Sequence, residues 1–356
     1  MAKVVVGMSG GVDSAVAAYL LKKKGHEVIG LTLRTWLASD GTESRCCEID
    51  DARRAAWSVD IPYYTLNSSS VFQSKVIKPF IDSYICGQTP NPCIECNRFV
   101  KWERMLYFAK VLGADYVATG HYASVVQLEN GRYTVKKALH AEKDQTYMLA
   151  ALSQEQLSAT LMPLGSLSKD EVRDIAREAG IPVAEKEDSQ EICFVTDGNY
   201  SDFITQNAGR ELSDEGHFVD EDGKILGKSR GIFHYTVGQR KGLCLAMGYP
   251  VYVKKIIAEK NLVVVAKDES LCSSEIICRK TNFMSIPGIA ENERICCTVK
   301  IRYHHQGEKA RIENFGRDAI RVVFEKPVRA AAPGQSAVFY DDDNCVMGCA
   351  VIAEVR

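Results

Sequence analysis

The chain has 356 residues, of which 46% are hydrophobic and 25% charged, and its formal net charge is −2. This length exceeds what one hydrophobic core usually serves, so we expect two or three domains. No apolar run approaches the ~18 residues of a membrane-spanning helix and no secretory signal is evident, which indicates a soluble cytoplasmic protein. The thirteen cysteines then favour reactive thiols, metal ligands or small buried side chains over a disulfide framework.

The N-terminal part alternates predicted strands with predicted helices. Strands are expected at 4–8, 27–33, 63–66 and 116–120, and helices at 12–24, 50–59, 70–84 and 101–112. This order predicts a doubly wound parallel sheet, in which ligands bind at the carboxyl ends of the strands. The turn after the first strand and the segment 118–122 should therefore face one crevice. A further helix is expected within Leu167–Gly180, with Ser168 as its N-cap.

After about residue 200 the pattern changes to short β segments. A glycine-rich and charged central region has predicted strands at 217–219, 225–226 and 233–237. Beyond about residue 276, strands are expected at 295–303, 309–313, 320–324, 336–340 and 346–355. Their close spacing and the turn signals between them predict a small antiparallel β-barrel. We therefore expect three domains, at 1–200, 201–273 and 274–356.

The most informative segment follows the apolar run at 4–6. It reads Gly7, Met8, Ser9, Gly10, Gly11, Val12, Asp13 and Ser14. Glycines permit positive φ, the serines add hydroxyl donors, and the helix start adds oriented N–H groups, so the turn predicts a phosphate site. The alternative is an ordinary capped strand-to-helix turn. No Gly-Lys-Ser/Thr follows the glycines, which excludes a Walker A loop. The segment instead resembles the pyrophosphate-binding loop of enzymes that cleave ATP between its α and β phosphates.

Three cysteines stand out from the rest. Cys93 and Cys96 lie three apart in a proline-framed polar segment, which we expect to be a rigid loop unsuited to burying thiols. The following Arg98 and Lys101 favour the thiolate form of a neighbouring cysteine. Cys193 lies between a polar and an apolar segment. Structural zinc is the alternative, but a single Cys-x-x-Cys without a second pair or a nearby histidine is a weak zinc signal.

Positive charge gathers in two later segments although the net charge is near zero. One contains Lys228, Arg230, Arg240, Lys241, Lys254, Lys255 and Lys260, and the other Arg294, Lys300, Arg302, Lys309 and Arg311. Such local patches fit docking to a nucleic-acid phosphate backbone, whereas solvated lysine-rich faces are the equally common alternative.

Taken together, the motifs resemble those of the tRNA-specific 2-thiouridylases, enzymes that place sulfur on C2 of the wobble uridine. The resemblance covers nearly the whole chain, through GMSGGVDS at 7–14, CCEIDDARRAA at 46–56, NPC-x-x-CNRFVKW at 91–102, ATGHYA at 118–123, KDQTYML at 143–149, DSQEICF at 188–194, YTVGQRKGL at 235–243, KIRYHHQ at 300–306 and APGQSAVFY at 332–340. Their joint order separates the chain from the GMP, NAD and argininosuccinate synthetases, which share the pyrophosphate loop.

The resemblance implies an adenine nucleotide α-hydrolase-like fold, ATP with Mg²⁺ as cofactors, and adenylation of the C2 oxygen before sulfur attack. It implies ATP phosphates at 7–14, adenosine beside Leu33 and Gly120, Cys96 as the nucleophile and Cys193 as the second catalytic cysteine. The positions that it assigns to tRNA or the target base are Asn91, Pro92, Cys93, His121, Lys143, Asp144, Gln145, Arg302, Tyr303 and Gln335. A buried or capping His121 and a solvated Lys143 are the alternatives. Expected partners are tRNA and a sulfur-donor protein or persulfide carrier, and we expect a monomer.

Cys93 departs from the family pattern, which has an aspartate there. One interpretation is a neutral replacement with an unchanged persulfide relay. The other is a [4Fe–4S] cluster held by Cys93, Cys96 and Cys193, able to collapse to a disulfide involving Cys193. A second hypothesis for function is a catalytically weakened tRNA-binding homologue, which the intact loop and the presence of Cys96 and Cys193 disfavour.

Overall fold

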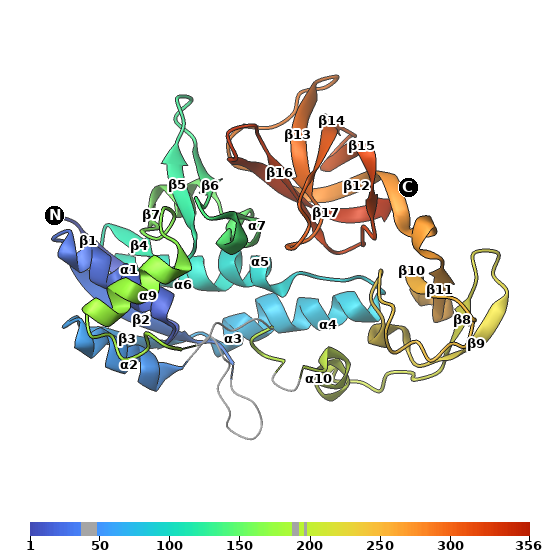
Figure 1. Ribbon diagram of the computed structural model, residues 1–356, viewed down its shortest axis with the longest axis horizontal. Coiled ribbons are helices and arrows are strands. Elements are labelled where there is room, and N and C mark those ends of the chain that lie inside the picture. Colours follow the sequence, from blue (N-terminus) through green and yellow to red (C-terminus); the bar gives the residue numbers. More distant parts are fainter. Residues whose placement is uncertain (37–47, 187–191, 196–197) are drawn as a thin grey trace.

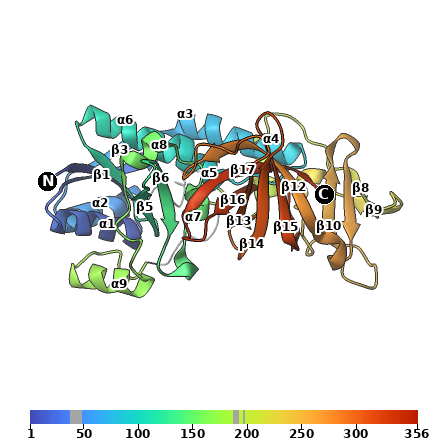
Figure 2. The same cartoon turned by 90° about the horizontal axis from the view of Figure 1, so that it is seen from above.

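The computed structural model describes residues 1–36, 48–186, 192–195 and 198–356. Three units follow one another along the chain: an N-terminal α/β unit, a middle β unit and a C-terminal barrel (Figure 1). Seen from above, the barrel lies between the other two although it comes last in the sequence (Figure 2). In the described part of the chain, no helix is long and apolar enough to cross a membrane.

The α/β unit is built on a five-stranded sheet in the order β3-β2-β1-β4-β7, with all neighbouring pairs parallel. Its strands are β1 (Lys3–Gly7), β2 (Glu27–Arg34), β3 (Tyr63–Asn67), β4 (Tyr116–Ala118) and β7 (Thr160–Leu161). Parallel sheets are covered on both faces, which explains the continuous apolar run of β1. The predicted doubly wound sheet is confirmed, and only the two-residue β7 is additional.

Helices cover both faces of this sheet (Figure 1). They include α1 (Val12–Lys23), α2 (Ile49–Ser58), α9 (Lys169–Glu178) and α6 (Glu103–Val111). Val4 and Val6 of β1 pack with the first three of these helices, whereas Val5 packs with α6 through Met105. Successive side chains of a strand point to opposite faces, so β1 connects the two apolar layers.

Two long helical runs lie across the middle of the molecule in Figure 1. The first consists of α3 (Ser69–Phe72), a π-helical turn (Gln73–Ile77) and α4 (Lys78–Ile85). The second consists of α5 (Pro92–Cys96), a π-helical stretch (Asn97–Trp102) and α6. The loop predicted at 91–98 is therefore wrong. Proline is well suited to the first helical turn, and Asn91 caps this helix by accepting a hydrogen bond from the Cys93 N–H at 3.2 Å.

The middle unit begins with α10 (Tyr200–Asn207) and contains a sheet in the order β10-β11-β8-β9. Its strands are β8 (Gly216–Val219), β9 (Ile225–Ser229), β10 (Tyr252–Ile257) and β11 (Leu262–Ala266). The strand predicted at 233–237 is wrong. Phe233, Tyr235 and Val237 are all buried, which gives strand-like alternation, but the backbone forms a 3-10 turn, Ile232–His234, with local hydrogen bonds.

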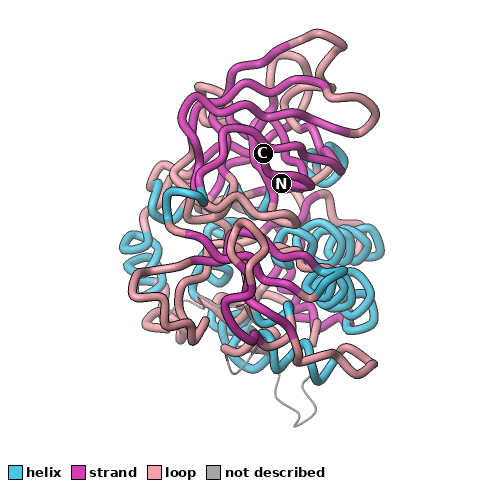
Figure 3. The backbone as a smooth tube through the Cα atoms, turned by 90° about the vertical axis from the view of Figure 1, so that its right-hand side faces the viewer, coloured by secondary structure: helices cyan, strands magenta, loops and turns pink. Residues whose placement is uncertain are grey.

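The C-terminal unit is a closed barrel in the order β12-β15-β14-β13-β16-β17. Its strands are β12 (Cys272–Phe283), β13 (Arg294–Lys300), β14 (Glu308–Asn314), β15 (Ala319–Arg329), β16 (Ser336–Tyr340) and β17 (Val346–Val355). All its pairs are antiparallel, so the predicted barrel is confirmed. In Figure 3 its strands gather at one end of the molecule, above the helices.

A β-hairpin joins the barrel to the α/β unit. It consists of β5 (Ala123–Gln127) and β6 (Tyr133–Lys137), and the short helices α7 (Thr146–Leu149) and α8 (Gln154–Ser158) follow it. The Thr134 hydroxyl donates to the carbonyl of Val346 at 2.6 Å, and the Arg132 guanidinium donates to the carbonyl of Met284 at 2.7 Å. These bonds attach the hairpin to the barrel.

Candidate active site

The glycine-rich turn leaves β1 and enters α1 at the carboxyl edge of the parallel sheet. The Ser14 hydroxyl donates to the carbonyl of Gly11 at 3.0 Å and accepts from the Ser9 N–H at 3.2 Å. The Ser9 hydroxyl oxygen accepts from the Gly11 N–H at 3.4 Å. The two serines therefore hold the turn curled above the N-terminus of α1, where backbone N–H groups favour an anion.

Two glycines let other segments approach this turn closely. Gly10 has a φ of +84°, and a Cβ there would lie 2.7 Å from the carbonyl oxygen of Glu48. A Cβ on Gly120 would lie 2.5 Å from the carbonyl carbon of Asp13 and 2.6 Å from the nitrogen of Ser14. Gly120, expected beside adenosine, thus packs against the first turn of α1.

The other residues expected at the nucleotide also lie along the sheet edge. Leu33 is buried near the end of β2. The Met8 N–H donates to the carbonyl of Leu31 at 2.8 Å, and the carbonyl of Met8 accepts from the Thr32 hydroxyl at 2.6 Å. Gly7 faces the side chain of Met105, and a Cβ added to Gly7 would lie 2.9 Å from the Met105 sulfur. The helical run that ends in α6 therefore packs against the start of the turn.

The same helical run carries Cys93 and Cys96. Cys93 is exposed, but Cys96 is only 7% exposed and belongs to an apolar cluster with Phe72 and Phe80. The expectation that this segment cannot bury a thiol is wrong for Cys96, because the segment is helical and one of its sides faces the cluster. Cys96 and Met105 lie on the same helical run, so one element connects the thiol with the phosphate turn.

Cys193 meets this cluster from a distant part of the sequence. It is half-buried and packs against the cluster that contains Cys96. The neighbouring Phe194 anchors the segment, with ring centroids 5.6 Å from Phe72 and 5.3 Å from Phe80. The structure thus brings Cys96 and Cys193 to one apolar cluster.

The three cysteines do not form a ligand set as they are placed. Among the described residues, which include all three, no group of three His, Cys, Asp or Glu side chains could hold a metal ion. Cys93 is exposed whereas Cys96 is buried in the apolar cluster. Cys46 and Cys47 lie outside the described residues.

Gln335, expected at tRNA, holds the segment that leads to α5. Its side-chain amide donates to the carbonyl of Thr89 at 3.0 Å, and the Thr89 N–H donates to the carbonyl of Pro333 at 2.8 Å. Asn91 caps α5 and donates toward the Met148 sulfur at 3.7 Å, while Pro92 is buried in the first turn. The barrel therefore positions the helix that carries the cysteines.

The residues expected at tRNA in the segment 119–146 have partners within the fold. Asp144 is buried and accepts from the Thr146 hydroxyl at 2.8 Å, and the Gln145 side chain accepts from the Tyr122 N–H at 2.9 Å. His121 lies 2.8 Å from the Thr119 hydroxyl, and burial lowers its pKa to about 3. A neutral His121 cannot provide a positive charge for a phosphate. Lys143 ends a short 3-10 turn.

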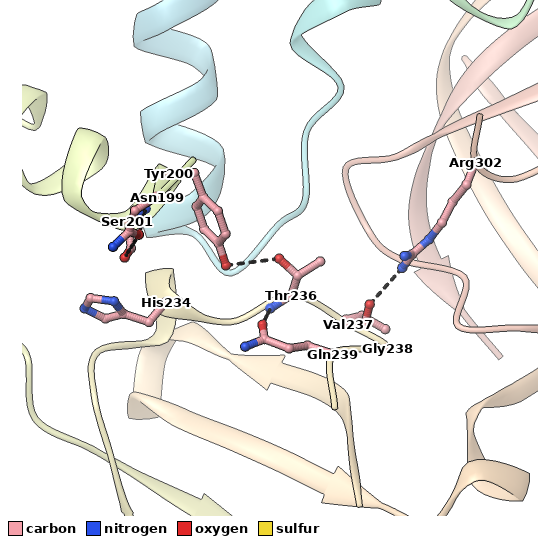
Figure 4. Close-up of a pocket in the computed structure, with 9 residues that line it drawn as sticks. All are labelled: Asn199, Tyr200, Ser201, His234, Thr236, Val237, Gly238, Gln239 and Arg302. Atoms are coloured by element: carbon pink, nitrogen blue, oxygen red, sulfur yellow. Dashed lines mark hydrogen bonds between the residues drawn. The ribbon is translucent and has the colours of Figure 1, made fainter. Parts of the chain in front are cut away.

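Arg302 connects the barrel with the middle unit. Its guanidinium donates to the carbonyl oxygens of Val237 at 2.8 Å and Ala330 at 2.9 Å, and burial lowers its pKa. It borders a pocket of about 460 Å³ where α10, the middle unit and the barrel meet (Figure 4). Tyr303 is partly buried with its ring 6.2 Å from that of Tyr147. The Arg302 side chain therefore fixes two units to each other.

Sequence analysis missed two lysines that pair with carboxylates in or beside the phosphate turn. Lys169, at the first position of α9, donates to Asp13 at 2.8 Å. Lys186 pairs with Glu48 and Asp51 next to Gly10. A positive charge directly after a helix N-cap interacts unfavourably with the positive end of the helix dipole. The unusual position of Lys169 was therefore the sequence signal that could have identified it.

The parallel sheet with its glycine-rich turn, followed by two β units, defines a nucleotide-binding HUP-domain protein with two appended β domains. Three family models match the chain: a tRNA methyl transferase HUP domain over residues 2–197, a tRNA methyl transferase PRC-barrel domain over 201–267, and an aminomethyltransferase beta-barrel domain over 273–352. The chain is 49% identical to the tRNA-specific 2-thiouridylase MnmA of Lachnoclostridium phytofermentans, over 99% of this chain and 100% of that protein. It is 50% identical to the MnmA of Acetivibrio thermocellus, over 97% and 98% of the two chains.

The chain therefore belongs to the tRNA-specific 2-thiouridylase family. Among solved structures, it is similar to the U34-tRNA thiolase NcsA from Methanococcus maripaludis with its [4Fe-4S] cluster, with a TM-score of 0.36 and 19% identity over 58% of this chain and 66% of that one. A 4-thiouridine synthetase in complex with RNA and bound ATP gives a TM-score of 0.38 and 18% identity over 58% and 50% of the two chains. Neither likeness bears on the function of this chain.

Proposed function

We propose that the protein uses ATP to replace the C2 oxygen of a wobble uridine in tRNA with sulfur. The observation that carries this proposal is the arrival of Cys96 and Cys193 at one apolar cluster, at the end of a helix that also packs against the phosphate turn. A protein that only binds tRNA has no need for this arrangement. Membership of the 2-thiouridylase family supports the same substrate.

The phosphate turn carries the first step. The C2 oxygen of uracil is a poor leaving group, so it attacks the α phosphorus of ATP and pyrophosphate departs. Residues 7–14 would hold the phosphates through the Ser9 and Ser14 hydroxyls and the N–H groups at the start of α1. Leu33 would line the adenosine site, with Gly120 allowing close backbone approach. Mg²⁺ would neutralise phosphate charge when bound.

The two cysteines carry the second step. A persulfide on Cys96, loaded by a sulfur-donor protein or persulfide carrier, attacks C2 through its outer sulfur, and AMP leaves. The thiolate of Cys193 then attacks the Cys96 sulfur, which breaks the S–S bond and leaves sulfur on the base. The product is a Cys96–Cys193 disulfide, which an external dithiol must reduce before the next turnover.

The target base has to leave the anticodon stack to reach a thiol in this position. Lys143 and Tyr303, with the basic segments of the middle and barrel units, would bind the RNA strand through charge and stacking. Four residues expected at tRNA would affect tRNA binding indirectly, through the segments that they hold in place. They are Arg302, Gln335, Gln145 and Asp144. We infer a cytoplasmic monomer, in keeping with a tRNA substrate.

The products of ATP cleavage test the first step. Incubation of the protein with ATP, Mg²⁺ and cognate tRNA is expected to release AMP and pyrophosphate in equal amounts, because the turn lacks the Walker lysine that favours attack at the γ phosphate. Chromatography of labelled nucleotide distinguishes these products from ADP and orthophosphate. ADP as the product, or no dependence on tRNA, would contradict the proposal.

The alternative source of sulfur is a [4Fe–4S] cluster on Cys93, Cys96 and Cys193, with one iron open for sulfide. Thiolates are suitable ligands for such a cluster. As placed, however, the three thiols do not fit a shared group, since Cys93 is exposed and no ligand triad exists among the described residues. The placement of these thiols therefore favours the persulfide relay over a cluster.

Replacing Cys93 distinguishes the two sources of sulfur. The Cys93→Asp variant is expected to thiolate tRNA from a persulfide donor within about threefold of the wild-type rate, because an exposed side chain at the first turn of α5 also accommodates a carboxylate. Iron analysis and absorbance of anaerobically purified protein provide the second readout. Iron that is lost in Cys93→Asp together with activity would support the cluster instead.

A further inference from the structure

Lys169 occupies an unusual position for a lysine. It is the first residue of α9, next to the N-cap Ser168, and only 9% of it is exposed. A buried ammonium group loses hydration, and the positive end of a helix dipole adds to that cost. A lysine at this position therefore needs a strong partner.

The partner is the aspartate of the phosphate turn. Lys169 Nζ donates to Asp13 Oδ1 at 2.8 Å and to Oδ2 at 3.0 Å. The Tyr122 hydroxyl donates to the same Oδ1 at 2.8 Å. Both carboxylate oxygens of Asp13 thus accept hydrogen bonds from protein groups.

Three elements meet at this carboxylate. Asp13 is in the first turn of α1, Tyr122 follows β4, and Lys169 begins α9, which lies along α1 in Figure 1. Gly120 completes the junction, because its backbone packs directly against the Asp13–Ser14 peptide. The orientation of the first α1 turn, whose N–H groups and Ser14 hydroxyl would bind the phosphates, is therefore set by its contacts with Tyr122, Lys169 and Gly120.

We propose that Lys169 is a positioning residue for ATP: it holds Asp13, and through Asp13 the phosphate turn, in the orientation that binds the nucleotide for adenylation. This inference rests on the proposed function for the reaction that the turn serves. Asp13 acts here as the link between Lys169 and the turn, and the anion meets the backbone N–H groups and serine hydroxyls.

The test is the Lys169→Met variant, which keeps the aliphatic stem and removes the charge. Its kcat/KM for ATP in tRNA-dependent pyrophosphate release is expected to fall about 100-fold, the size of effect that a misplaced binding group produces, while KM for tRNA stays unchanged. Lys169→Arg, which can pair with both Asp13 oxygens, should recover most of the activity. A Lys169→Met value within about threefold of wild type would overturn the proposal.

A control on the same helix separates positioning from general stability. Arg177→Gln removes exposed ion pairs of α9 to Asp174 and Glu185 and should leave kcat/KM for ATP unchanged. If Lys169→Met folds poorly, Lys169→Gln provides the same comparison with one donor retained. The double variant Asp13→Asn/Lys169→Met should lose no more than the worse single variant, because the two residues act as one unit. Additive losses would contradict this linkage.

The affinity for ATP, measured by calorimetry without tRNA, tests the role of Lys169 separately from the proposed function. If the wild-type protein binds ATP but releases no pyrophosphate with tRNA, the proposed function fails while the ATP affinities of the variants still decide the role of Lys169. Equal ATP affinity in wild type and Lys169→Met would overturn the positioning role alone.

Discussion

Replacing Cys96 by serine is expected to abolish 2-thiouridine formation, by a factor on the order of 10⁴ or more, because a hydroxyl cannot carry a persulfide. Pyrophosphate release in a single turnover should persist, since adenylation precedes sulfur transfer. In the Cys193→Ser variant, the rate of 2-thiouridine formation over multiple turnovers should fall to a similar extent. Mass spectrometry of nucleosides from treated tRNA measures the product, and a quenched burst of pyrophosphate measures the first step.

Stability needs its own control in this experiment. Cys96 is buried beside aromatic rings, so a serine hydroxyl there destabilises the fold by about 1–2 kcal/mol. Cys96→Ala removes the thiol without burying a hydroxyl and should be equally inactive. Cys297→Val is the matched control, because burial raises the pKa of the Cys297 thiol to about 12 and makes it a poor nucleophile at neutral pH. Near-normal thiolation by Cys96→Ala would refute the assignment of Cys96.

The features that sequence analysis placed correctly all have strong local signals. The apolar run of β1, the glycines after it and the apolar helix α1 identify the phosphate turn without any tertiary information. The capping box of α9, formed by Ser168 and Glu171, and the turn-separated strands of the barrel are equally local. In these segments local preference and tertiary packing agree, and therefore the pattern alone predicts the element.

Some errors arise where the decisive contacts are distant in sequence, and others where a local signal was overlooked. Two prolines near Cys93 indicated a loop, but the Asn91 cap and the packing of Cys96 make the segment a helix. The β5–β6 hairpin had an available signal in Asn130-Gly131 between two β-prone runs. Lys169 and Asp13 are 156 positions apart, so neither one indicates the other in a pattern. Arg302 links two units through the carbonyl oxygens of Val237 and Ala330. These partners are also distant in sequence, so the sequence around Arg302 does not indicate them.

Gly120→Ala is expected to remove ATP-dependent activity although the change adds a single methyl group. The added Cβ would lie 2.5 Å from the carbonyl carbon of Asp13 and 2.6 Å from the Ser14 nitrogen. These are backbone atoms at the start of α1 and cannot rotate away as a flexible side chain would. Either the strand exit or the phosphate turn must move, and we expect kcat/KM for ATP to fall 100-fold or more, roughly the effect of a 1 Å displacement.

Overpacking at this position should also destabilise the fold by about 1–3 kcal/mol, measured as the free energy of unfolding in urea. Gly288→Ala is the matched control, because a Cβ there meets nothing within 4 Å and its φ lies outside the left-handed range. That variant should retain both stability and activity. If Gly120→Ala instead binds and cleaves ATP like the wild-type protein, the close contact between β4 and the phosphate turn does not set the geometry of adenylation, and the positioning role of the Asp13 junction fails with it.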